Sequence, residues 1–273
     1  MTITGFSHWT LAVTDLERST AFYRDVMGWQ LVGTDEHARR FVRDGQRVEL
    51  RSTAKGTSTP AAAPAVNHLG LSHITVATGP APAVLASLHR LARVKVRDHT
   101  RSSFTPGMEQ AGTQFLFEDP DGNIIETYAA EDDWNAFGVG DSDPARSNDV
   151  GIAHLSHWSL CVADPARSLP FYRDVMGWKE CAVIEWEGEG PSIVMDVGPA
   201  RLTTWLLAAG DQRIEIIHFT EPPVIARPGS GATGTGLAHM TVTVDDVAEG
   251  DVVELRDPDG NLIRGVASAP SWA

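Results

Sequence analysis

A repeated segment constrains this chain more than any other feature. Ser7–Trp29 reads SHWTLAVTDLERSTAFYRDVMGW, and Ser156–Trp178 reads SHWSLCVADPARSLPFYRDVMGW. Sixteen of the 23 positions are identical at a constant offset, as in His8 and His157 (157 − 8 = 149). A repeat this close indicates two structural halves of the same kind. Each copy predicts a strand that carries a histidine, then a helix, then the turn Met-Gly-Trp.

Two shorter motifs also occur twice. GLSHITV, which contains His73, returns as GLAHMTV, which contains His239, and DPDGNIIE, ending at Glu126, returns as DPDGNLIR, ending at Arg264. The DPDG segment is a strong turn signal between strands. The motifs predict an α+β protein of four tandem βαβββ modules, at residues 6–53, 69–130, 155–219 and 236–267.

The fourth module is expected to be truncated. Its histidine and the aspartate that opens its DPDG turn are 18 residues apart (257 − 239), against 46 in the second module (119 − 73). The shortfall corresponds to the helix and one strand. The acidic and polar stretch 131–152 resembles an interdomain linker. We therefore expect a first domain over residues 1–130 and a second, degenerate domain over residues 153–273.

Composition excludes several classes of partner. The net charge of −14 argues against nucleic acid or an anionic membrane surface, since both favour a basic protein. No apolar run approaches the roughly 20 residues of a membrane span, and the N-terminus lacks a signal-peptide pattern. The only cysteines, Cys161 and Cys181, fit a reducing cytoplasm better than a disulfide framework. A cytoplasmic protein that binds a small molecule, as a monomer or a homodimer, is the expectation.

Two histidines and two glutamates recur at equivalent strand positions of the first two modules. Each faces away from the side that its module's helix is expected to cover. Two imidazoles and two carboxylates suit a six-coordinate divalent metal with open positions for substrate. The residues are His8, Glu49, His73 and Glu126.

The order of these motifs resembles the vicinal oxygen chelate superfamily, which includes glyoxalase I, extradiol dioxygenases and bleomycin-binding proteins. The resemblance rests on the strand histidines, FYRDVMGW, VEL, GLSHITV and FEDPDGNIIE. It implies modules paired into two cup-shaped domains, each cup surrounding a metal position. It also implies that the four recurring residues match the metal-ligand positions of glyoxalase-like members.

The second half departs from that pattern. His157, Glu215 and His239 are present, but Arg264 replaces the last glutamate, and arginine stays protonated and cannot bind a cation. We therefore expect one divalent metal per chain (Fe, Mn, Co, Ni or Zn). Arg264 is expected to pair with Glu215 or to hold a substrate anion.

The location of that single site depends on how the modules pair. If the first module pairs with the second, which the linker favours, the ligands are His8, Glu49, His73 and Glu126. If the second pairs with the third, they are His73, Glu126, His157 and Glu215. In both arrangements Arg264 disables the other site.

The resemblance implies three candidate functions. The preferred one is a lyase or isomerase that chelates two adjacent oxygens of a small molecule and moves a proton through Glu49 or Glu126. The first alternative is a non-haem Fe(II) oxygenase acting on a catechol-like compound. The second is a protein that sequesters an aromatic drug or metabolite. Specificity is assigned to residues 39–43, 94–112 and 134–137.

Overall fold

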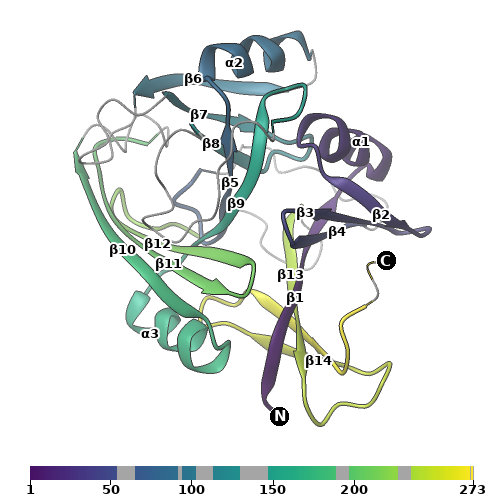
Figure 1. Ribbon diagram of the computed structural model, residues 1–273. Coiled ribbons are helices and arrows are strands. Elements are labelled where there is room, and N and C mark those ends of the chain that lie inside the picture. The colour runs from purple at the N-terminus through teal and green to yellow at the C-terminus, as the bar shows by residue number, and fades with distance from the viewer. Residues whose placement is uncertain are drawn as a thin grey trace.

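The protein is built from two mixed β-sheets with short helices packed against them (Figure 1). The computed structural model describes residues 1–53, 65–91, 94–102, 113–129, 147–188, 197–226, 235–270 and 272. Most of the predicted linker, residues 131–146, and the predicted specificity residues 103–112 and 134–137 lie outside these ranges. No helix in the described ranges is long and apolar enough to cross a membrane. The expected α+β class is confirmed.

The seven-stranded sheet joins the first and last parts of the chain. Its strand order is β14-β15-β13-β1-β4-β3-β2. The helix α1 (Leu16–Ala21) continues into the π-helical turn η1 (Phe22–Val26) between β1 and β2. Its strands are β1 (Ile3–Val13), β2 (Gln30–Thr34), β3 (Ala38–Arg43), β4 (Gln46–Ser52), β13 (Gly236–Val244), β14 (Val252–Arg256) and β15 (Leu262–Val266).

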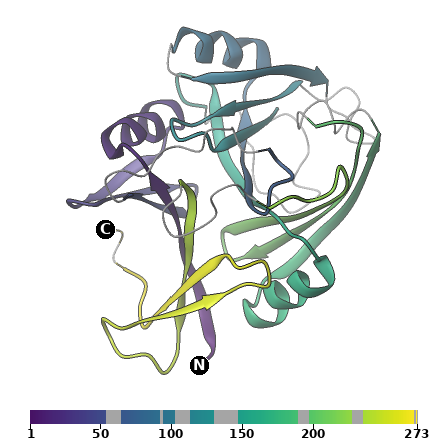
Figure 2. The same ribbon diagram turned by 180° about the vertical axis from the view of Figure 1, so that it is seen from behind.

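The eight-stranded sheet contains the middle of the chain and is strongly curved (Figures 1 and 2). Its strand order is β10-β11-β12-β9-β5-β8-β7-β6. It carries α2 (Ala81–Arg90), and α3 (Pro165–Pro170) with η4 (Phe171–Val175). Its strands are β5 (Gly70–Thr78), β6 (Lys95–Ser102), β7 (Thr113–Glu118), β8 (Ile124–Ala129), β9 (Ile152–Cys161), β10 (Lys179–Gly188), β11 (Ala200–Ala209) and β12 (Gln212–Glu221).

The sheet order corrects the preferred pairing of modules. β5 of the second module pairs antiparallel with β9 of the third, and β1 of the first pairs antiparallel with β13 of the fourth. Neither sheet therefore follows the expected division at the linker. As expected, the final module is short: between its histidine strand β13 and its last strand β15 the structure has β14 and no helix within residues 235–270.

The two sheets face each other through a core of aromatic side chains. Trp9 of β1 stacks on Trp158 of β9, with ring centroids 4.9 Å apart and an interplanar angle of 16°. Both indoles are fully buried, as are the equivalent residues Trp29 and Trp178. The tryptophans of the repeat thus fill the core between the sheets. Burying an aromatic side chain of this size contributes on the order of 2–3 kcal/mol each.

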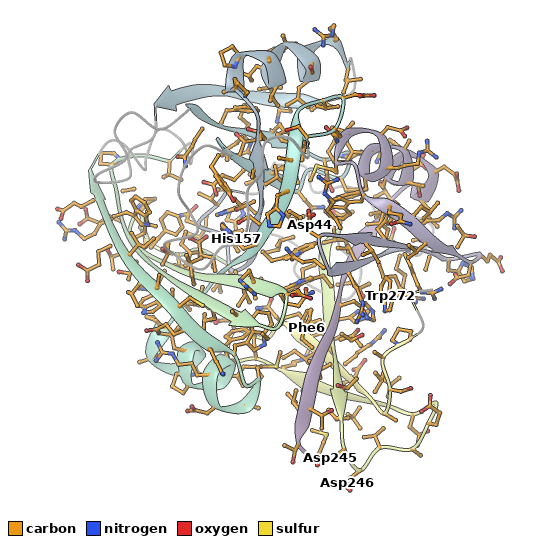
Figure 3. All side chains as sticks on the ribbon, viewed as in Figure 1. Phe6, Asp44, His157, Asp245, Asp246 and Trp272 are labelled. Carbon is orange, nitrogen blue, oxygen red and sulfur yellow. The ribbon has the colours of Figure 1, made fainter. Side chains whose placement is uncertain are left out.

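The turn between β3 and β4 fixes one sheet to the other. Asp44 and Gly45 both have positive φ angles, 51° and 78°, as a two-residue type I′ hairpin requires. The Asp44 carboxylate accepts a hydrogen bond of 3.0 Å from the backbone N–H of Leu155 in β9 (Figure 3). The Gln46 amide donates to the carbonyl of Leu155 at 2.7 Å. A local turn signal thus also sets the distance between the sheets.

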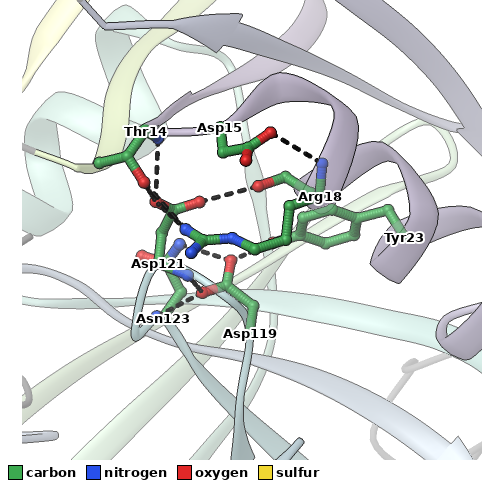
Figure 4. Close-up of polar contacts among 8 residues, drawn as sticks. Thr14, Asp15, Arg18, Tyr23, Asp119, Asp121 and Asn123 are labelled. Carbon is green, nitrogen blue, oxygen red and sulfur yellow. Dashed lines mark hydrogen bonds and ion pairs between the residues drawn. The ribbon is translucent and has the colours of Figure 1, made fainter. Parts of the chain in front are cut away.

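The helix of the first module docks on the DPDG turn of the second (Figure 4). The hydroxyl of Tyr23 donates to Asp119 Oδ2 at 2.7 Å, and that of Ser19 donates to Asp121 Oδ2 at 2.8 Å. The backbone N–H and hydroxyl of Thr14 donate to Asp121, and Asp15 caps α1 by accepting from the N–H of Arg18.

The same contact recurs in the second half of the chain. Tyr172 donates to Asp257 at 2.6 Å, and Ser168 donates to Asp259 at 2.8 Å. Asp164 caps α3, and Pro165 is the first residue of that helix. The FYRD and DPDG motifs are therefore two halves of one buried contact.

Removing the Tyr23 hydroxyl should destabilise the protein more at high pH than at low pH. Burial raises the pKa of the Asp119 carboxyl to about 6. A raised pKa in the folded state stabilises the protein below the unfolded value near 4, and this contribution is lost as the pH rises through about 6. Without the hydrogen bond from the Tyr23 hydroxyl, burying the ionised Asp119 carboxylate costs more free energy still. We expect Tyr23→Phe to cost about 1–3 kcal/mol at pH 8 and less at pH 5.

Urea unfolding at pH 5, 6.5 and 8 measures this difference. Tyr172→Phe removes the equivalent hydroxyl and should shift the unfolding free energy in the same direction. An unfolding penalty for Tyr23→Phe that is equal at all three pH values would contradict the role given to Asp119.

Candidate metal centre

The pairing of β5 with β9 brings two histidines together. In this antiparallel ladder His73 lies opposite Ser159, and Thr75 lies opposite His157. The two imidazole rings are 6.5 Å apart between centroids, and the two residues are 1% and 4% exposed. Figure 3 labels His157 inside the curve of the eight-stranded sheet. Histidines from different modules therefore share one buried position.

Parallel neighbours of these strands supply two carboxylates. β8 places Glu126 beside Thr75, and β12 places Glu215 beside Ser159. The Thr75 hydroxyl donates to Glu126 Oε2 at 3.0 Å, and the Ser159 hydroxyl donates to Glu215 Oε2 at 2.6 Å. In both cases a hydroxyl two residues after the histidine orients the carboxylate on the next strand.

The four side chains converge on a small volume. His73 Nε2 lies 3.2 Å from Glu126 Oε2 and 3.4 Å from Glu215 Oε2, and His157 Nε2 lies 3.8 Å from Glu215 Oε2. One ligand atom from each of His73, His157 and Glu215 can lie within 4.8 Å of the others. His73 Nε2 is buried within reach of both carboxylates. A buried imidazole nitrogen between two carboxylates fits a divalent metal ion.

A serine precedes each histidine and orients its ring. Ser72 Oγ lies 3.0 Å from His73 Nδ1, and Ser156 Oγ lies 2.8 Å from His157 Nδ1. With the proton on Nδ1, the Nε2 lone pair faces the carboxylates, as metal binding requires. The Ser-His dipeptide was visible in the sequence, but nothing in the sequence distinguished it from chance. The fourth module has Ala238 in place of the serine.

The metal-free centre holds a proton where a cation fits. Burial alone would lower the pKa of His73. The charges of Glu126 and Glu215 and their hydrogen bonds with His73 outweigh burial and raise this pKa to about 10. Burial alone would raise the pKa of Glu215, but the hydrogen bond from His73 and the charge of His157 lower it to about 2. Burial lowers the pKa of His157. One positive charge between two carboxylates is therefore the stable state of these residues.

The remaining predicted residues lie in the other sheet. Thr10 of β1 lies opposite His239 of β13 and beside Glu49 of β4, while Arg264 lies in β15. His8 precedes Thr10 by two residues in β1 and shares its face. The preferred set of His8, Glu49, His73 and Glu126 is thus divided between two sheets. The alternative set of His73, Glu126, His157 and Glu215 is the one that the structure assembles.

Two further expectations change with this arrangement. Arg264 pairs with Glu254 at 3.3 Å, not with Glu215, which lies in the other sheet. Glu49 is held by Arg51 at 2.7 Å and Arg40 at 3.2 Å, so it does not reach His73. Residues 39–43, expected to set specificity, belong to the seven-stranded sheet.

The fold and the centre together define a class of protein. Its members have two mixed sheets built from repeated modules, and here one sheet carries a buried group of histidines and glutamates. The sequence profile of the Glyoxalase/Bleomycin resistance protein/Dioxygenase superfamily matches residues 5–127 and 151–250. These ranges cover more than half of the chain, so the chain belongs to this superfamily. No curated protein sequence matches the chain significantly.

Solved structures share the fold over almost the whole chain. Glyoxalase I from Zea mays superposes with a TM-score of 0.61 at 18% identity, over 96% of this chain and 92% of that one. A candidate dioxygenase from Bacillus subtilis superposes with a TM-score of 0.59 at 16% identity, over 99% of this chain and 87% of that one. At these identities the comparison establishes the fold.

Loss of a ring-orienting serine should weaken metal binding. Ser156→Ala removes the partner of His157 Nδ1, and such losses typically lower metal affinity about 10–100-fold. Ser7→Ala is the matched control, because Ser7 makes the same contact with His8, at 2.9 Å, in the other sheet. Competition with a metal chelator measures both affinities. Equal affinities in the two variants would place the metal elsewhere.

Proposed function

We propose that this protein is a metal-dependent lyase or isomerase that acts on a small molecule with two adjacent oxygens. The observation that carries the proposal is the convergence of His73, Glu126, His157 and Glu215 from four adjacent strands. When bound, a divalent metal would polarise the substrate oxygens and stabilise an enediolate-like oxyanion. One group of this kind is found among the described residues.

We assign metal binding to the three residues whose side chains are buried and held by neighbouring hydroxyls. His73, His157 and Glu215 each have the ligand atom buried and the rest of the side chain fixed. The two imidazoles are fixed by Ser72 and Ser156, and Glu215 by Ser159. Preorganised side chains of this kind lose little entropy when a ligand binds.

We assign proton transfer to Glu126. Its Oε2 is occupied by Thr75 and faces His73, whereas its Oε1 accepts no hydrogen bond from the described residues. Its side chain is 12% exposed, so Oε1 can take a proton from a substrate carbon and return it to a neighbouring one. Glu49, the other carboxylate expected to act as base, is neutralised by two arginines in the other sheet.

An oxygenase is the alternative, and one observation favours it. The group of His73, His157 and Glu215 has the composition of the two-histidine, one-carboxylate triad that binds Fe(II) in oxygenases. If Glu126 stays off the metal, three coordination positions are open for a catechol-like diolate and dioxygen. The metal that the protein carries distinguishes the two functions.

We expect one equivalent of divalent metal per wild-type chain and a loss of most of it in Glu215→Ala. Glu49→Ala removes the same residue type at the equivalent position of the other sheet and should keep the full equivalent. Elemental analysis of protein purified without oxygen or chelators measures the stoichiometry. Metal retained in Glu215→Ala and lost in Glu49→Ala would overturn the assignment of the centre.

The reaction class is tested on the metal-loaded protein. For a lyase or isomerase, NMR in D₂O should show metal-dependent deuterium exchange beside the carbonyl of α-hydroxycarbonyl compounds. Glu126→Gln should slow this exchange about 100-fold or more while metal stays bound, because it removes the proton acceptor. Bound iron and oxygen uptake with catechols, without exchange, would favour the oxygenase.

A further inference from the structure

The seven-stranded sheet has a face equivalent to the metal centre, and that face is rich in arginine. Register places Glu49 opposite Arg40, while Arg47 and Arg51 follow the same alternation on β4. Arg264 of β15 lies beside Thr241 of β13, two residues after His239. Four guanidinium groups therefore share the face that carries His8 and His239.

The arginines explain why Glu49 does not act like its counterpart Glu215. In the eight-stranded sheet the position opposite Glu215 is Leu206, whereas the position opposite Glu49 is Arg40. Ile217 follows Glu215 by two residues, whereas Arg51 follows Glu49 by two. Because its neighbours on the sheet are apolar, Glu215 pairs with His73 and His157. Glu49 pairs with Arg40 and Arg51 instead.

This face contains hydrogen-bond donors that lack acceptors. Thr10 Oγ1 is fully buried and has no hydrogen-bond partner among the described residues. The hydroxyls at the two equivalent positions, Thr75 and Ser159, each donate to a carboxylate. Arg47 is half-buried and forms no ion pair within the described part of the chain. Thr10 and Arg47 can therefore both donate to an anionic acceptor.

Charges on the face leave an excess of positive groups. Arg40 pairs with Glu49 and with Asp35 at 3.0 Å, Arg51 pairs with Glu49, and Arg264 pairs with Glu254. Four arginines thus face three carboxylates. An anion that reaches this surface has no uncompensated negative charge to repel it.

The histidines of this face add no positive charge of their own. Burial chiefly, and then His239 and the arginines, lower the pKa of His8 to about 3. Burial chiefly, and then Arg264 and Arg51, lower the pKa of His239 to about 3. Both imidazoles are therefore neutral at physiological pH, in a positive surrounding.

An aromatic side chain flanks the same position. The ring of Trp272 lies edge-on to the ring of His8, with centroids 5.0 Å apart (Figure 3). Its indole N–H is buried and donates to no described residue. A ligand here would meet an indole on one side and guanidinium groups on the others.

We propose that this face binds a small anion, a carboxylate or phosphate group, between Thr10, Arg47, Arg51 and Arg264. Arg264 occupies the position that Glu126 has in the candidate metal centre, and with Arg40, Arg47 and Arg51 it makes this face positive. Guanidinium groups bind such planar or tetrahedral anions through paired N–H donors. The anion site does not depend on the function proposed for the metal centre.

Calorimetric titration of the metal-loaded protein with inorganic phosphate at low ionic strength tests this site. We expect one binding event per chain, weakened about tenfold in Arg47→Gln and in Arg264→Gln, since each loses a charge-assisted hydrogen bond. Glu49→Gln should tighten binding, because it releases Arg40 and Arg51. Arg24→Gln is the control: Arg24 is exposed and pairs with Asp25, so phosphate affinity should not change.

Other outcomes decide against the proposal. Phosphate binding that persists in Arg47→Gln and Arg264→Gln would place the anion on the metal or elsewhere, and a wild-type protein that binds neither phosphate, acetate nor benzoate would remove the site. Circular dichroism and metal content confirm that each variant is folded. Parallel titrations with acetate and benzoate separate the ligand classes: a carboxylate site flanked by Trp272 should prefer benzoate, and a phosphate site should bind neither.

Discussion

The antiparallel ladder between β5 and β9 is the interaction on which the candidate metal centre depends. It joins the second and third modules. Its register pairs His73 with Ser159 and Thr75 with His157, so the two histidines are offset by two residues across the strand pair. The parallel neighbours β8 and β12 then place a glutamate on each side. Every ligand position is thus fixed by main-chain hydrogen bonds, with serine and threonine hydroxyls correcting only the final orientation. The geometry of the centre is a property of the sheet more than of any loop.

The two sheets show how small changes redirect the same scaffold. In both sheets a central strand carries a histidine and, two residues later, a hydroxyl residue. The next parallel strand places a glutamate beside that hydroxyl residue, Glu49 in one sheet and Glu215 in the other. They differ in the residues next to that glutamate, where Leu206 and Ile217 in one sheet correspond to Arg40 and Arg51 in the other. A buried carboxylate binds the nearest cation, and in the seven-stranded sheet that cation is part of the protein. The chemistry of each face is therefore decided by the strand next to the ligands.

The sequence predicted most of the secondary structure and the residue types of the centre. The shortened last module follows from the short interval between its histidine and its DPDG turn, and the structure confirms it. The pairing of modules was not predictable in the same way, because each module exposes an equivalent first strand and the polar linker suggested the wrong boundary. The partnership of Tyr23 with Asp119 was also hidden, because both are common residues that meet only after two modules pack.

The strand order also dictates when parts of the protein can assemble during synthesis. β1 pairs with β13, so that Ile3 lies opposite Val244. The eight-stranded sheet lies wholly between these two strands in the chain and can close first. β1 must wait, with an apolar face and a free edge, until nearly all of the chain has left the ribosome. Contacts this distant in sequence slow folding and leave unpaired strands open to association.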